Sequence, residues 1–147
     1  MFDNSEGKLT QGRDQDSQPE KWKHLNQYER KYLKEVMQSY DKIVQDTNDW
    51  FRIANCYQLS AEDVQRAKDY AFGSGVSKNK FAPDERMVEA WHRMALGEGT
   101  NIDEVLLRHE IFESNLVINQ GMNQKDAHDQ AQAIYPWSIL IQQSKNQ

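Results

Sequence analysis

Several features are scarce in this 147-residue chain, and each absence excludes a class of protein. A single cysteine, Cys56, rules out an internal disulfide and a cysteine-rich zinc site. No apolar run approaches the roughly 20 residues that a helix needs to span a bilayer. No alternating strand pattern with a hairpin turn occurs. Positive charge is also in deficit: the net charge of −5 argues against broad binding to nucleic acid, although it allows an enzyme that acts on nucleic acid through a local site.

Apolar residues recur instead at spacings of three and four along most of the chain, which is typical of amphipathic helices. Residues 1–19 are polar and lack this periodicity, so we expect a flexible lead-in there and a single helical domain over residues 20–147. Capping residues, glycines and prolines divide the helical pattern. The predicted segments are Glu20 to about Gln45 with a short continuation over 49–57, Ser60 to Gly73, a loop over 74–80, Ala82 to Gly97 with Pro83 in the first turn, Thr100 to Gly121, and Asn123 to Trp137 with an interruption at Pro136.

The predicted fold class is therefore all-α, a compact bundle of five or six helices with a buried central helix over about 101–120. Two apolar strips run along that helix, roughly opposite one another, and a helix that is apolar on two sides is usually surrounded. At about 100° per residue, His109 and Glu113 fall near the centre of the wider strip. A carboxylate on a buried face is costly unless a metal, a cation or hydrogen bonds satisfy it. Those two residues are therefore candidates for a functional site.

The turn at Gly121 predicts a partner for these two side chains. Glu113 lies about eight residues before the turn, roughly 12 Å along a helix axis, and His128 lies about seven residues after it, roughly 10 Å. Antiparallel neighbours would bring Glu113 and His128 to the same level, with His109 one turn further out. Small alanines on the second helix would let the two helices approach closely. The sequence thus predicts a cluster of His109, Glu113 and His128.

Two histidines and one carboxylate form a reasonable open ligand set for zinc or another divalent ion. Glu110 is rotated about 100° away from His109 and could act as a general base on water or orient a ligand. The run departs from the zinc-protease pattern HExxH, because Glu113 occupies the position of the second histidine. A second interpretation needs no metal: His109 and His128 act as acid and base, and Glu113 holds one imidazole in its tautomer. A third interpretation is a satisfied hydrogen-bond network that locks two core helices in register.

Arg86 and His92 carry a weaker pattern. Their spacing is similar to the Arg-x(4–6)-His signature of HEPN-type ribonucleases, which are also all-α and pair two such motifs across a dimer. A single short motif of this kind is more often part of a solvated helix face, and we interpret it so.

Four short motifs follow one another in the second half of the chain. They are Ala-Lys-Asp-Tyr-Ala-Phe at 67–72, Pro-Asp at 83–84 followed by Ala-Trp at 90–91, an aliphatic-x-His-Glu-x-x-Glu-Ser run at 107–114, and Ala-His-x-x-Ala at 127–131. With these motifs the stretch from about Ala67 to Trp137 resembles a C-terminal domain of bacterial polymorphic toxins, the variable tips of contact-dependent and related secreted effectors. It covers roughly half of the chain.

The resemblance implies a hydrolase, a nuclease or another kind, which a bacterium delivers into the cytoplasm of a competing cell. It implies a cognate immunity protein as partner, and it points to His109, Glu110, Glu113 and His128 as the site, with a divalent metal such as zinc as the candidate cofactor. The acidic net charge departs from the basic character common in nuclease tips and leaves the substrate open. The alternative from a different class is a non-enzymatic, cytoplasmic interaction or structural module, for instance a phage or secretion-system component, whose His/Glu cluster only holds the core together.

Overall fold

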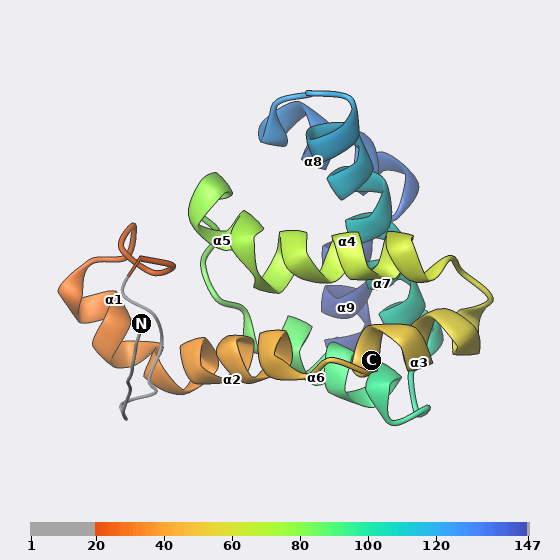
Figure 1. Cartoon of the computed structure of the whole chain (residues 1–147), viewed down its shortest axis with the longest axis horizontal. Helices are drawn as coiled ribbons and strands as arrows, with labels where there is room; N and C mark the ends of the chain where they lie inside the picture. Colours follow the sequence, from red (N-terminus) through yellow and green to blue (C-terminus); the bar gives the residue numbers. More distant parts are fainter. Residues whose placement is uncertain (1–19, 147) are drawn as a thin grey trace, which may run out of the picture.

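The computed structural model describes residues 20–146, which contain nine α-helices, one π-helical turn and the segments that connect them, and no strand (Figure 1). The predicted all-α fold is confirmed, whereas the predicted five or six helices are too few. The predicted lead-in over residues 1–19 lies outside the described residues. In chain order the elements are α1 (Gln27–Tyr32), α2 (Lys34–Gln45), α3 (Asp49–Tyr57), α4 (Ala61–Phe72), α5 (Ser74–Asn79), α6 (Glu85–Ala95), α7 (Asn101–Ser114), the π-helix η2 (Asn115–Asn119), α8 (Gln124–Ile134) and α9 (Trp137–Lys145).

The prediction of one continuous helix from Glu20 to about Gln45 is wrong at the start of the helix and in its middle. It begins at Gln27 because the Asn26 side chain accepts a hydrogen bond from the backbone of the first turn and caps it, and it breaks at Leu33 between α1 and α2. Trp22 precedes the helix in a turn and is still fully buried. Tyr28 and Tyr32 fit the spacing of three and four by which residues 20–45 are predicted to form an apolar helix face, yet they are 76% and 77% exposed. The periodicity of the sequence alone therefore did not predict which side of α1 is buried.

The predicted loop over 74–80 is also wrong, because these residues form the short helix α5. The chain can turn back there only because Gly75 has no side chain: a Cβ atom on it would lie 2.1 Å from the carbonyl oxygen of Tyr70. Pro83 lies before the next helix and not in its first turn, since Asp84 is the N-cap of α6. The start and stop signals predicted at Thr100 and in the 121–126 turn are confirmed.

Helix α7 contacts α4, α6, α8 and α9, and α4 crosses it in Figure 1. Leu106 and Leu107, on two different sides of α7, are 3% and 1% exposed. The second predicted strip, formed by Leu107, Ile111 and Ile118, does not stay buried along its length, because Ile118 in η2 is 52% exposed. The regular helix ends at Ser114, so the predicted central helix over 101–120 changes to π-helix over its last five residues.

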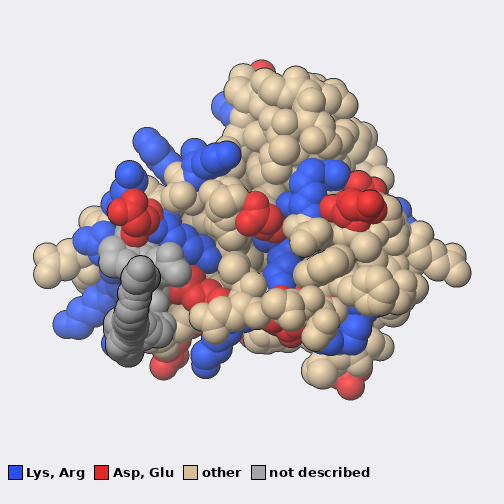
Figure 2. All heavy atoms as spheres, viewed as in Figure 1, with Lys and Arg blue, Asp and Glu red and all other residues tan. Residues whose placement is uncertain are grey.

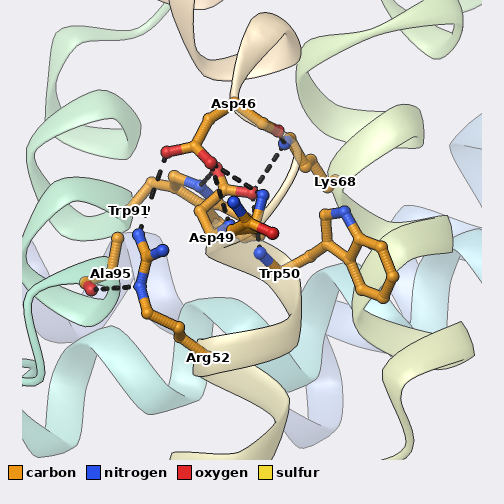
Figure 3. Close-up of polar contacts among 8 residues, drawn as sticks. Asp46, Asp49, Trp50, Arg52, Lys68, Trp91 and Ala95 are labelled. Atoms are coloured by element: carbon orange, nitrogen blue, oxygen red, sulfur yellow. Dashed lines mark hydrogen bonds and ion pairs between the residues drawn. The ribbon is translucent and has the colours of Figure 1, made fainter.

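A buried ion pair joins α3 to α4 and was not predicted (Figure 3). The Lys68 ammonium lies 2.6 Å from one carboxylate oxygen of Asp49, and the indole N–H of Trp91 donates to the other oxygen at 2.8 Å. Lys68 also donates to the carbonyl oxygen of Asp46 at 2.5 Å. Both charged side chains are almost fully buried, and their hydrogen bonds offset the cost of that burial. The pair fixes how α3, α4 and α6 pack.

Among residues 20–146, no helix is both long enough and apolar enough to cross a membrane. On the face shown in Figure 2, acidic and basic side chains are interspersed.

Candidate functional site

His109, Glu113 and His128 converge at the junction of α7 and α8. The Nε2 atom of His109 lies 2.8 Å from Oε1 of Glu113, and the Nδ1 atom of His128 lies 3.1 Å from the same oxygen. The two imidazole rings are 5.1 Å apart between centroids. The proximity of Glu113 and His128, which was predicted from the turn at Gly121, is confirmed. Ala127 and Ala131, the small residues of α8 that were predicted to let the helices approach, are both fully buried.

Glu113 is the centre of this cluster and is 2% exposed. Its second oxygen, Oε2, accepts a hydrogen bond from the Tyr70 hydroxyl at 2.5 Å and from the Gln124 amide at 3.2 Å. Burial by itself would raise the pKa of Glu113, but the hydrogen bonds from His109, Tyr70 and Gln124 outweigh it and hold the pKa below its ordinary value. Burial, together with its hydrogen bond to Glu113, raises the pKa of Tyr70. Glu113 is therefore a carboxylate in the folded protein.

The backbone fixes which nitrogen of His109 carries a proton. Its Nδ1 atom lies 3.0 Å from the carbonyl oxygen of Tyr135, which can only accept, so Nδ1 must donate. In the neutral ring Nε2 then presents a lone pair to the Glu113 carboxylate, which is also an acceptor. A cation must lie between them, either the proton of an imidazolium or a metal ion. Without a metal, burial lowers the pKa of His109, but Glu113 and Glu110 outweigh it and raise that pKa above its ordinary value.

His128 differs from the other two side chains because its ring is 48% exposed. Nδ1 faces Glu113, and Nε2 has no hydrogen-bond partner among the described residues. His128 therefore closes the cluster on the solvent side and keeps one nitrogen available. Ligand atoms of His109, Glu113 and His128 all lie within 4.8 Å of one another, so the group could hold a metal ion. Two imidazoles and one carboxylate suit zinc or a similar divalent ion, with further coordination positions open to water or substrate.

Glu110 does not join the cluster, as its rotation along α7 predicted, but it lines the same cavity as Glu113 and His128. That cavity has a volume of about 250 Å³. The Glu110 carboxyl forms no hydrogen bond within the described part of the chain. Burial raises the pKa of Glu110 to about 8, His109 opposes this shift, and the neighbouring Glu113 adds a smaller increase. A carboxyl group with that pKa can give up or take a proton near neutral pH.

Three contributors to the site were missed from the sequence. Tyr70 comes from α4, 43 positions before Glu113, and its only signal was its place in the motif at 67–72. Tyr135 contributes a backbone carbonyl, so no residue type could have revealed it. Gln124 is the first residue of α8, where a polar side chain is expected for other reasons.

Two residues singled out in the sequence stand apart from this site. Arg86 pairs with Asp84 at 2.8 Å and stacks over Trp137 at 5.2 Å, and His92 is exposed on α6. Neither residue lines the cavity, which agrees with the interpretation of a solvated helix face.

No family model, no curated protein and no solved structure matches the chain. The function must therefore be argued from the site itself.

Proposed function

We propose that this chain is a metal-dependent hydrolase domain of the toxin or effector type. In this proposal His109, Glu113 and His128 hold a divalent ion, zinc or similar, and Glu110 is the general base. The observation that carries the proposal is the convergence of His109 Nε2, Glu113 Oε1 and His128 Nδ1 beside an accessible cavity. The Tyr135 carbonyl supports it, because metal-binding histidines commonly donate their other ring N–H to such a group, which aims the free nitrogen at the ion.

The residues around the cavity suit hydrolysis. A divalent ion held by His109, Glu113 and His128 would supply Lewis acidity toward water and substrate. Glu110, which lines the same cavity, takes a proton from the attacking water and returns it to the leaving group. Tyr70 and Gln124 hold the Glu113 carboxylate in place through its second oxygen, and so leave the first oxygen for the ion.

The toxin or effector assignment comes from the resemblance over residues 67–137, and the positions of its motifs support it. The segment 67–72 supplies Tyr70, the segment 107–114 supplies three of the four site residues, and the segment 127–131 supplies His128. Asp84, from the Pro-Asp motif, lines the same cavity. Motifs that are dispersed in the sequence thus meet at one place. On this proposal the domain acts in the cytoplasm of a target cell, and its partner is a cognate immunity protein.

One observation favours the non-enzymatic alternative. Glu113 already makes four polar contacts, with Tyr70, Gln124 and the two histidines, so the cluster is a complete hydrogen-bond network without a metal. In that case the chain is an interaction or structural module, it binds no ion, and its expression harms no cell.

Tightly controlled expression in bacteria separates the two functions. We expect the wild type to kill the host and Glu110→Gln, a substitution of nearly equal shape, to be harmless. Glu98→Gln, on an exposed residue outside the cavity, is the matched control and should kill like the wild type. A folded Glu110→Gln variant that kills equally, or a harmless wild type, would refute the proposed hydrolase.

A further inference from the structure

Positive charge is unevenly distributed along the chain, although the net charge is −5. Residues 20–45 and 74–80, which contain α1, α2 and α5, together have eight lysines and arginines against four aspartates and glutamates. The other described residues have eight against fifteen. Basic side chains are most frequent in Figure 2 on the side of the molecule where α1 and α5 lie in Figure 1, with a few acidic ones between them. The acidic average of the chain therefore conceals a local basic surface.

Six exposed basic residues form this surface, which we call the α1–α5 surface: Lys23, Arg30, Lys31, Lys34, Lys78 and Lys80. None of the six forms an ion pair with another described residue. The arginines of α6 and α7 differ in this respect, because Arg86, Arg93 and Arg108 each pair with a carboxylate. Within the described part of the chain, the charges of the α1–α5 surface are thus available to an anionic partner.

The two parts of the α1–α5 surface meet beside the cavity of the candidate site. The Nε2 atom of His24, in the turn before α1, lies 2.7 Å from the carbonyl oxygen of Phe81 and therefore donates to it. Phe81 directly follows Lys80, the C-cap of α5. Phe81 and Ala82 line the cavity. The α1–α5 surface consequently reaches the rim of that cavity.

Two exposed aromatic rings lie within the α1–α5 surface. Tyr28 and Tyr32 are one turn apart on α1, and their ring planes are parallel to within 3°, with 6.3 Å between the centroids. Neither ring belongs to a hydrophobic core cluster, and both are more than three-quarters exposed. Arg30 and Lys31 lie between them in the sequence. Flat aromatic faces next to positive charges are the combination on which the bases of a single strand stack.

We propose that the α1–α5 surface binds single-stranded nucleic acid. The lysines and the arginine neutralise phosphates along the strand, and bases stack on Tyr28 and Tyr32. A duplex keeps its bases inside its own stack, so it could use the positive charges but not the tyrosines. This binding requires neither a metal ion nor Glu110, and it is therefore independent of the proposed hydrolysis.

Two other anionic partners suit the surface less well. Protein interfaces are depleted in lysine, whereas five of the six basic residues here are lysines. Helices that bind a membrane surface insert leucine, phenylalanine or tryptophan among the lipids. Helix α1 has only six residues, and apart from its two tyrosines all of them are polar. An acidic polypeptide and an anionic membrane are therefore the competing outcomes of the test.

Fluorescence anisotropy of the full chain carrying Glu110→Gln, in the presence of a chelator, measures binding without cleavage. The probes are a labelled oligothymidine of about 15 nucleotides, within the range of single-strand site sizes, and its duplex with oligoadenosine. Tyr28→Ala combined with Tyr32→Ala should weaken oligothymidine binding at least about tenfold and leave duplex binding unchanged. Phe51→Ala, which removes another exposed aromatic ring on α3, is the matched control and should bind like the parent.

The charges are tested by the dependence of binding on salt. Changing Lys31, Lys34, Lys78 and Lys80 together to glutamine should lower the slope of log affinity against log salt concentration by about 2–3, since each phosphate of a single strand contributes roughly 0.7. Lys125→Gln combined with Lys145→Gln, on exposed positions of α8 and α9, should leave the slope unchanged.

No binding of oligothymidine, or equal binding by the parent and the double tyrosine variant, would overturn the proposal. Tighter binding of polyglutamate, or of vesicles that contain phosphatidylserine, than of oligothymidine would also overturn it. All samples lack both a metal ion and the Glu110 carboxylate, so none of these results depends on the proposed hydrolase, which bacterial expression tests separately.

Discussion

Two substitutions of Glu113 should lower the free energy of unfolding by different amounts. Glu113→Ala deletes the acceptor of a buried hydroxyl and a buried imidazole, because Tyr70 and His109 are 1% and 4% exposed and both point at it. Glu113→Gln keeps the shape. Its amide oxygen can still accept from Tyr70, and its NH₂ group can donate to the Nε2 lone pair of a neutral His109.

The magnitudes follow from these contacts. The alanine variant leaves two buried polar groups without partners and opens a small cavity, and we expect it to lower the free energy of unfolding by about 3–5 kcal/mol. The glutamine variant loses only the charge-assisted part of the hydrogen bonds, about 1–2 kcal/mol. The contrast between the two is the prediction, since each variant alone has several explanations.

Urea unfolding of the metal-free chain, followed by far-ultraviolet circular dichroism in the presence of a chelator, measures both costs. Glu89→Gln, on an exposed position of α6, serves as the control and should change stability by less than about 0.5 kcal/mol. Equal costs for Glu113→Ala and Glu113→Gln, or a cost below about 1 kcal/mol for alanine, would refute the reasoning that Glu113 satisfies two buried groups.

Three further predictions concern pH, the buried ion pair and the α4–α5 turn. The raised pKa of His109 stabilises the fold fully below the ordinary value of 6.5, and this stabilisation is lost as the pH rises. The lowered pKa of Glu113 stabilises the fold fully above the ordinary value of 4.5, and this stabilisation is lost as the pH falls. Urea unfolding of the metal-free chain at a series of pH values should therefore show the largest contribution of the pair to the free energy of unfolding between pH 4.5 and 6.5. Lys68→Met leaves the buried Asp49 carboxylate without its cation and should lower the free energy of unfolding by about 3–5 kcal/mol in the same assay at pH 7. Gly75→Ala drives a methyl group into the α4 backbone and should lower Tm, with a cost of at least about 1–3 kcal/mol in calorimetry.

Each of these has an internal control. His109→Asn should make the loss of stability above pH 6.5 less steep, with the contribution of Glu110 remaining, and an unchanged profile would contradict the assignment. Asp49→Asn combined with Lys68→Met should recover part of the stability that Lys68→Met loses, because no unpaired buried charge remains. Gly97→Ser, in an open turn with nothing near its Cβ position, bears only the strain of its positive φ of 77° and should cost less than Gly75→Ala, and the reverse order would count against the steric explanation.

Features encoded locally could be predicted from the sequence. Ser60, Thr100 and Asn123 each cap the next helix through a backbone N–H three residues on, which is a pattern within a single turn. The pairing of Glu113 with His128 was also accessible, because one short turn separates their helices and helix rise fixes the level of each side chain.

Features that depend on distant segments were not accessible. The break at Leu33 and the outward orientation of α1 depend on what α2 packs against. The periodicity of the sequence does not encode this tertiary packing. The ion pair of Asp49 and Lys68 joins residues 19 positions apart on two different helices. Tyr70 reaches Glu113 across 43 positions, so the residue that donates most closely to the centre of the site could be found only in the folded chain.

Binding of Zn²⁺ itself, measured by isothermal titration calorimetry, tests the proposed metal site most directly. The wild type should bind one ion per chain at His109, Glu113 and His128, with release of protons because His109 must lose its own. His128→Ala, which removes a half-exposed ligand without disturbing the core, should bind at least about tenfold more weakly, and His92→Ala should bind like the wild type. No binding by the wild type, or equal binding by the wild type and His128→Ala, would contradict the proposed site.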